Sequence, residues 1–186
     1  MHNATGDPLR NNSVPVGPGG TASRTARALH LSPNSLVKQY PELNVLINNA
    51  GIMKVDNVHN PVDDALISSI VTTNLLGPVR MTSALIEHLK QQHAAWVIHL
   101  TSGTAFVPMA VTAAYNATKA ALHLVLAFAT VPAQRHQRQV LEVAPPYVQT
   151  ELMGLEQAVD PRAMPLREFV DETIRIPGTD AHEILT

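Results

Sequence analysis

The chain has 186 residues and a formal net charge of −2, with 45% hydrophobic and 15% charged residues. This length suits one domain with a sizeable core, and the small charge gives no electrostatic reason to expect nucleic acid or an anionic membrane as a partner. The sequence has no cysteine, which excludes disulfides and thiolate metal sites, and no 18-residue apolar run that could span a membrane.

The first part of the chain is rich in Asn, Pro, Gly, Ser and Thr and has no run of four apolar residues before Val45. We therefore expect residues 1–34 to form an irregular or disordered segment and residues 35–186 to form one domain. The stretch from Ser32 to Lys38 is expected to be the end of a helix. The N-terminus lacks the pattern of a signal peptide, so the expected location is the cytoplasm.

Three short apolar runs rich in β-branched residues predict buried strands. The low fraction of charged residues fits a parallel sheet that is covered on both faces. The three runs are Leu43 to Ile47, Trp96 to Ser102 and Val140 to Ala144.

Two helices are expected around the middle strand. Residues 64–92 have helical spacing, but Gly77 and Pro78 interrupt it. Pro78 has no N–H for the carbonyl of Asn74, four residues earlier, so we expect the helix to kink there. The second helix should begin near Thr112 and end at Pro132.

Tyr115 and Lys119 are spaced i,i+4, so on a helix they share one face. A tyrosine can donate a proton to a carbonyl oxygen, but its ordinary pKa of about 10 is high for exchange near neutral pH. A nearby ammonium favours the phenolate, so we expect Lys119 to lower the pKa of Tyr115. Ser102 ends the middle strand, at the edge where open α/β sheets bind ligands, and its hydroxyl can hold a substrate oxygen.

This set resembles the short-chain dehydrogenase/reductase family over roughly residues 35–165. The resemblance implies an α/β fold with a doubly wound, parallel Rossmann-type sheet, NAD or NADP as cofactor, and a small-molecule carbonyl or alcohol as substrate. It is compatible with a homo-oligomer. The residues that carry it are Asn74, Ser102, Tyr115, Lys119 and the segment Pro145-Pro146-x-Val148-x-Thr150.

The resemblance also assigns roles. Tyr115 would be the acid/base, Ser102 would orient the carbonyl, and Lys119 would tune the pKa and bind ribose. Asn74 would hold a relay water through its main-chain carbonyl, although it can also be read as a polar residue that only marks the bend. No metal site is expected. The cofactor-binding residues that the resemblance implies are Asn48, Ala50, Gly51, Tyr115, Lys119, Pro145, Val148 and Thr150.

Two features depart from the family pattern. Pro146 stands where the family usually has glycine and offers no N–H. The chain also has no Gly-x-x-x-Gly-x-Gly turn, which in the family holds the cofactor pyrophosphate at a helix N-terminus. We therefore expect a truncated domain that lacks its first strands and binds NAD or NADP weakly. The alternative function is a non-catalytic remnant or interaction module that keeps the dehydrogenase core.

Overall fold

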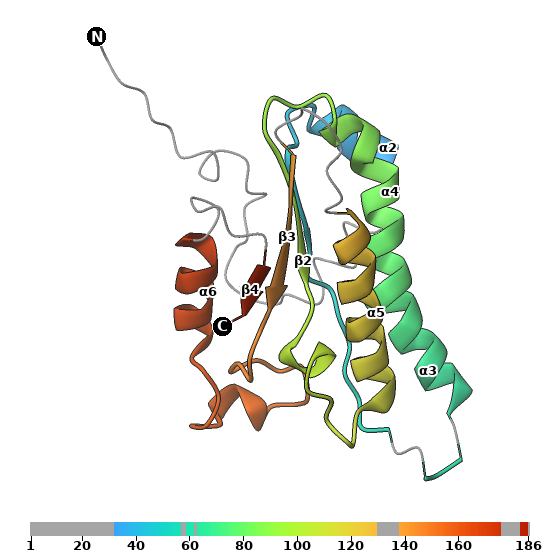
Figure 1. Cartoon of the computed structure of the whole chain (residues 1–186), viewed down its shortest axis with the longest axis vertical. Helices are drawn as coiled ribbons and strands as arrows, with labels where there is room; N and C mark the ends of the chain where they lie inside the picture. Colours follow the sequence, from blue (N-terminus) through green and yellow to red (C-terminus); the bar gives the residue numbers. More distant parts are fainter. Residues whose placement is uncertain (1–31, 57–58, 62, 130–137, 176–182, 186) are drawn as a thin grey trace.

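The computed structural model describes residues 32–56, 59–61, 63–129, 138–175 and 183–185. Residues 1–31 of the segment expected to be irregular (1–34) and the helix end expected at Pro132 lie outside this part. Helices cover both faces of a central sheet (Figure 1). In chain order the elements are α2 (Pro33–Gln39), β1 (Val45–Asn48), α3 (Asp64–Val71), η1 (Thr72–Leu76), α4 (Gly77–Leu89), β2 (Ala95–Leu100), η2 (Gly103–Ala105), α5 (Ala113–Ala129), β3 (Arg138–Ala144), η3 (Gln157–Val159), α6 (Leu166–Arg175) and β4 (Glu183–Leu185).

Helix α2 begins where the sequence led us to expect a helix to end. The Ser32 hydroxyl accepts a hydrogen bond from the backbone N–H of Ser35 (3.2 Å), and Pro33 occupies the first helical position. Serine before a helix and proline at its first position are both start signals. The helix expected over this stretch is therefore confirmed. The expectation that the stretch is the end of a longer helix is wrong, because the helix begins here.

The described sheet is parallel throughout, with strand order β1-β2-β3-β4. The middle strand β2 pairs Val97 with Leu46 of β1 and with Val140 of β3. The three predicted strands are thus confirmed, and β4 adds a fourth that the apolar pattern did not indicate. Because all strands run the same way, their carboxyl ends lie at one edge of the sheet.

The two faces of the sheet have separate cores. Side chains of α4 (Leu85, Leu89) pack on Val97 of β2, on the face that α2, α4 and α5 cover. On the other face, Phe169 of α6 packs in a cluster with Ile98. Figure 1 shows α6 across the sheet from α4 and α5, which confirms the expected doubly wound arrangement.

The long helix between β1 and β2 is interrupted at the predicted place. It runs as α3, then as a π-helix over Thr72–Leu76, and then as α4. Pro78 is the second residue of α4, and the residue four before it, Asn74, is fully buried inside the π segment. Since proline cannot supply the N–H that an α-helical carbonyl needs, the wider turn is the local solution at this site.

No helix in the described ranges is long and apolar enough to cross a membrane. Among the described strands, β1 lies at an edge, and its Ile47 side chain is 57% exposed. Ile47 is paired with Ile98, so it belongs to the face of the sheet that carries α6. An exposed apolar strand edge is a template for pairing with another chain.

We expect the 186-residue chain to self-associate through β1. A lysine on an edge strand opposes such pairing, so Ile47→Lys should weaken association roughly tenfold without unfolding the domain. Sedimentation velocity over a concentration series measures this, with Val107→Lys, which changes a side chain 77% exposed in a loop, as the control. A wild-type chain that sediments as a monomer and melts cooperatively would contradict the expectation.

Candidate active site

Ser102 lies just beyond the carboxyl end of β2. Its side-chain oxygen accepts hydrogen bonds from the backbone N–H of Thr104 (3.1 Å) and from the Thr104 hydroxyl (3.0 Å). The neighbouring Gly103 N–H donates to the carbonyl of Pro145 (3.0 Å), which follows β3. These bonds fix the turn after β2 and join it to the segment after β3.

Tyr115 and Lys119 enter the site from the first turns of α5, and both side chains are buried. The Lys119 ammonium donates a hydrogen bond to the carbonyl of Leu100 in β2 (2.7 Å) and lies 5.6 Å from the centre of the Tyr115 ring. The Ser102 side chain is near enough to the Tyr115 phenol to act on its pKa. The structure therefore brings together three residues that the sequence singled out.

Burial controls the ionisation of this group. It raises the pKa of Tyr115, and the nearby Ser102 side chain offsets this only in part. It lowers the pKa of Lys119 to about 8. We had expected Lys119 to lower the pKa of Tyr115, but the pKa is raised: burial is the largest effect on the phenol, and the Lys119 ammonium is held by the carbonyl of Leu100.

Asn74 holds the loop after β1 with its side chain. Its Oδ1 accepts from the N–H of Ile52 and its Nδ2 donates to the carbonyl of Ile52, both at 2.9 Å. Nδ2 also lies 3.3 Å from the hydroxyl of Thr118, in α5. The Asn74 side chain thus ties the π-helix to the loop and to the helix that carries Tyr115 and Lys119.

The segment after β1 reaches the site through Gly51. A Cβ at Gly51 would lie 3.6 Å from Oδ1 of Asn74 and 3.8 Å from Nζ of Lys119. Ala50, beside it, is exposed. The backbone here therefore passes close to Lys119 of α5 and offers a surface without a bulky side chain.

Asn48, at the end of β1, faces inward instead. Its amide donates to the hydroxyl of Thr82 (3.1 Å) and lies 3.3 Å from Nδ1 of His99. Burial and the Lys119 ammonium lower the pKa of His99 to about 4, so the ring is neutral at neutral pH and Nδ1 can accept this bond. Asn48 therefore steadies the sheet and does not line an open site.

The segment after β3 carries the remaining predicted residues. Pro145 and Thr150 are half-buried, whereas the Val148 side chain is 5% exposed and packs in the core on the α6 side. Val148 also forms a β-bridge with Met164. Any contact of Val148 with a cofactor therefore has to come from its backbone and not from its side chain.

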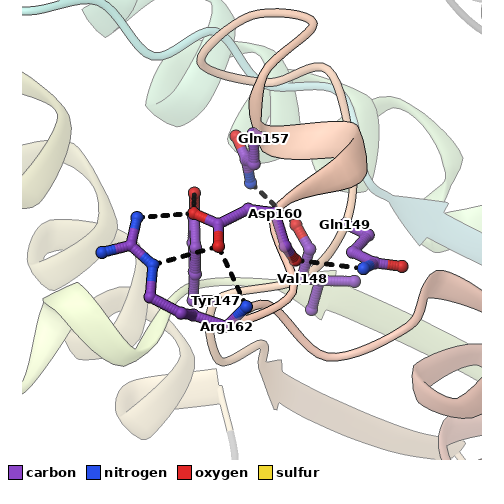
Figure 2. A network of polar contacts seen from close by, with 6 residues as sticks. All are labelled: Tyr147, Val148, Gln149, Gln157, Asp160 and Arg162. Atoms are coloured by element: carbon purple, nitrogen blue, oxygen red, sulfur yellow. Dashed lines mark hydrogen bonds and ion pairs between the residues drawn. The ribbon is translucent and has the colours of Figure 1, made fainter.

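Figure 2 shows a polar network that holds this segment. The Asp160 carboxylate accepts hydrogen bonds from Arg162, including one from Nη2 (2.7 Å), and from the Tyr147 hydroxyl (3.1 Å). The backbone carbonyl of Asp160 accepts a hydrogen bond from the side-chain amide of Gln149 (3.0 Å). Bonding to Arg162 holds the pKa of Asp160 far below its ordinary value. Gln157 belongs to the same network and bonds the carbonyl of Val148 (2.8 Å).

Sequence reasoning missed three supporting groups. Asp56 caps α5, since its Oδ2 accepts from the N–H of Ala114 (2.7 Å). Glu142 of β3 is buried and accepts from the hydroxyl of Thr101 (2.7 Å), and it pairs with Nδ1 of His123 (2.8 Å). Gln157 is the third. Asp56 and Glu142 join residues far apart along the chain, which no local spacing signals. Gln157 contacts nearby residues, but in an irregular segment without a periodic pattern.

Within the described residues, no group of three or more His, Asp or Glu side chains could hold a metal ion. His99 and His123 are both hydrogen-bonded to other side chains.

Comparison with known proteins agrees with this geometry. A model described as short chain dehydrogenase matches residues 23–159. The chain belongs to this family. It is 39% identical over 122 residues to the uncharacterized oxidoreductase DltE of Bacillus subtilis, a match that covers 62% of this chain and 46% of that protein. The chain thus spans about half the length of this relative.

Two solved structures share the fold. An alcohol dehydrogenase from the archaeon Thermococcus sibiricus, complexed with 5-hydroxy-NADP, has a TM-score of 0.72 at 17% identity, covering 83% of this chain and 66% of that one. A short chain dehydrogenase from Burkholderia cenocepacia in complex with NADP has a TM-score of 0.69 at 24% identity, covering 82% and 64%. At these identities the likeness concerns the fold.

The buried ammonium of Lys119 should give stability a measurable pH dependence. Its pKa falls from 10.5 in the unfolded chain to about 8 in the folded chain. Between these two pKa values the unfolded chain binds more protons than the folded chain, so Lys119 makes the free energy of unfolding rise with pH. Below pH about 8 the full cost of burying the charged ammonium lowers the stability of the folded chain. Lys119→Met should therefore lose stability relative to wild type as pH rises from 8 to 10.

Urea unfolding at a series of pH values measures this difference. The series stops at pH 10, the ordinary pKa of a tyrosine. Above it the folded chain keeps the Tyr115 proton that the unfolded chain loses, so this group makes the free energy of unfolding fall with pH. Lys54→Met, at an exposed lysine, is the control and should parallel wild type. Parallel curves for Lys119→Met as well would contradict the assignment of a buried, desolvated ammonium.

Proposed function

We propose that this chain is an NAD(P)-dependent oxidoreductase that interconverts a small-molecule carbonyl and the corresponding alcohol. The observation that carries the proposal is the meeting of Ser102, Tyr115 and Lys119 beyond the carboxyl end of β2. Membership of the short-chain dehydrogenase family supports the reaction class. The NADP and 5-hydroxy-NADP in the two similar structures support the class of cofactor.

The residues present fit the nicotinamide half of such a cofactor. An ammonium has three hydrogens, and the described bond of Lys119 to Leu100 uses one, which leaves two for ribose hydroxyls. Gly51 keeps the backbone bare beside that ammonium, and the half-buried Thr150 can reach the carboxamide. NAD(P)H, when bound, supplies the hydride that reduces the carbonyl carbon.

The protein groups supply the proton and hold the substrate. Because burial raises the pKa of Tyr115, its phenol is protonated at neutral pH and can donate to a carbonyl oxygen. The oxygen of Ser102 accepts two hydrogen bonds from Thr104, so its own hydrogen is available to donate. The two hydroxyls can therefore converge on one substrate oxygen. At neutral pH the phenol is in the protonated form that carbonyl reduction needs.

A second function is favoured by one observation on the sequence. The 186 residues contain no Gly-x-x-x-Gly-x-Gly turn, on which pyrophosphate binding normally depends. A chain that keeps the core of the fold without this turn could act as a non-catalytic interaction module. Cofactor affinity separates the two candidates, because only the first requires it.

We expect this chain to bind NADH or NADPH with a dissociation constant in the millimolar range. The nicotinamide half keeps its partners, but the pyrophosphate loses several charge-assisted hydrogen bonds worth roughly 1.5–3 kcal/mol each. Isothermal calorimetry or nucleotide fluorescence measures this affinity. Micromolar binding would contradict the expectation and reveal a phosphate site elsewhere in the chain, whereas the absence of any binding would favour the interaction module.

Replacing the phenol should remove catalysis. Where carbonyl reduction is measured, Tyr115→Phe should lower kcat by about 10²- to 10⁴-fold, the usual contribution of general acid catalysis. Tyr40→Phe, which removes a phenol from an exposed site after α2, is the matched control and should keep the rate. Full activity of Tyr115→Phe would rule out the mechanism proposed here.

A further inference from the structure

Three residues of α5, spaced i, i+4 and i+8, face the sheet, and each meets a different part of it. Tyr115 lies near Ser102, beyond the end of β2, and the Lys119 ammonium is bonded to a carbonyl of β2 (2.7 Å). His123, one turn further along the helix, is bonded to Glu142 of β3 (2.8 Å). The proposed reaction uses the first two contacts and gives no role to the third.

Glu142 is a buried carboxylate that bridges two other elements. It is 6% exposed, and its Oε1 accepts a hydrogen bond from the hydroxyl of Thr101 (2.7 Å). Its Oε2 lies 2.8 Å from Nδ1 of His123, which has to donate because a carboxylate only accepts. His99, the register partner of Glu142 on β2, is bonded to Asn48 instead. Burying a carboxylate is costly unless it is hydrogen-bonded, so the two bonds of Glu142 hold both partners in place.

Both partners of Glu142 belong to the segments that carry the reacting hydroxyls. Thr101 directly precedes Ser102, and its backbone N–H donates to the carbonyl of Val143 in β3 (2.8 Å). His123 lies on the same face of α5 as Tyr115, two turns away. A helix that is bonded at one point can pivot about it, whereas two bonded points on one face fix its direction. The bond of His123 to Glu142 supplies the second point, beyond that of Lys119.

We propose that Glu142 is a positioning residue for the reaction: it holds the Ser102 hydroxyl and the Tyr115 phenol at the separation from which both can reach one substrate oxygen. It acts through Thr101 on one side, and through His123 and the direction of α5 on the other. This inference rests on the proposed function. Since the carboxylate acts by geometry, an uncharged group that makes the same two bonds should replace it.

The phenol of Tyr115 reports its placement against Ser102 without any cofactor. Ser102 lowers the pKa of this phenol, so Ser102→Ala should raise that pKa by roughly one unit, about the effect of one hydrogen bond to a charged group. The pKa is measured by carbon NMR on chains labelled at tyrosine Cζ, and Tyr115→Phe identifies the resonance. The titration covers pH values well above the pKa of Lys119, which is about 8, so that the ammonium does not change with it.

A double-mutant cycle tests the role of Glu142. In Glu142→Leu the two hydroxyls lose their fixed separation, so Ser102→Ala should raise the phenol pKa by less than half as much as in wild type. Glu142→Gln should keep the full effect, because its amide can accept from Thr101 and donate to Nδ1 of His123. Thr101→Val, which keeps the shape of the side chain, should act like Glu142→Leu and replaces it in the cycle if the leucine variant does not fold.

Asn44 offers a matched control. Its Nδ2 donates to the carbonyl of Ala94 (3.1 Å), so it also joins residues far apart along the chain. These two residues precede β1 and β2, at the amino ends of the strands and therefore at the edge of the sheet opposite Ser102. Asn44→Leu should leave the effect of Ser102→Ala on the phenol pKa unchanged, whatever it does to the melting temperature. A merely structural role for Glu142 would make the two leucine variants alike.

Catalysis gives a second readout, which depends on the proposed function. Carbonyl reduction is measured by chromatography of the product, at cofactor concentrations above the measured dissociation constant. Glu142→Leu should lower kcat about 10- to 100-fold, the usual cost of a small misplacement of reacting groups. Glu142→Gln should restore the wild-type rate.

The outcomes separate the inference from the proposed function. Loss of the Ser102→Ala effect in Glu142→Leu and Thr101→Val, together with its retention in Glu142→Gln, supports the role of Glu142. An effect that survives in the first two variants, is lost in Glu142→Gln, or is absent in wild type overturns that role and leaves the proposed function standing. A wild-type chain that shows the effect but reduces no carbonyl and binds no nicotinamide cofactor overturns the proposed function, and with it the part of Glu142 in a reaction.

Discussion

The bond between the Lys119 ammonium and the carbonyl of Leu100 is the contact on which the site depends. Burying an ammonium is costly unless a strong acceptor meets it, and here a strand carbonyl does so at 2.7 Å. This bond joins α5 to β2, the two elements that supply Tyr115 and Ser102. The spacing between the phenol and the serine hydroxyl is therefore set by a lysine one helical turn away.

Two hydroxyls in this structure have their donor direction set by other hydrogen bonds. Ser102 accepts from the N–H and the hydroxyl of Thr104, and Thr150 accepts from Gln157 and from Leu152. In both cases the lone pairs are engaged and the hydrogen remains to be donated. Neither orientation has to be created when a ligand arrives, which is the condition for preorganised electrostatic stabilisation.

The sequence predicts what is local. The i,i+4 spacing of Tyr115 and Lys119, the three strands and the interruption at Pro78 all follow from periodicity or from a missing N–H within a few residues. The pKa of Tyr115 could not be predicted, because its direction depends on burial by the whole fold and not on the nearest charge. The cap from Asp56 and the pair of Glu142 with His123 were likewise invisible, since each links separate elements.

The π-helix over Thr72–Leu76 gives the long helix a change of phase. One extra residue in a turn rotates everything beyond it by about 100° relative to an uninterrupted α-helix of 3.6 residues per turn. The residues of α4 are therefore out of phase with the 3.6-residue repeat of α3, and in this phase Leu85 and Leu89 pack on Val97 of β2. A deletion of a single residue within this turn would leave a regular α-helical turn and keep the packed face of α4 on β2, whereas the same deletion inside α4 would rotate the residues beyond it by about 100°.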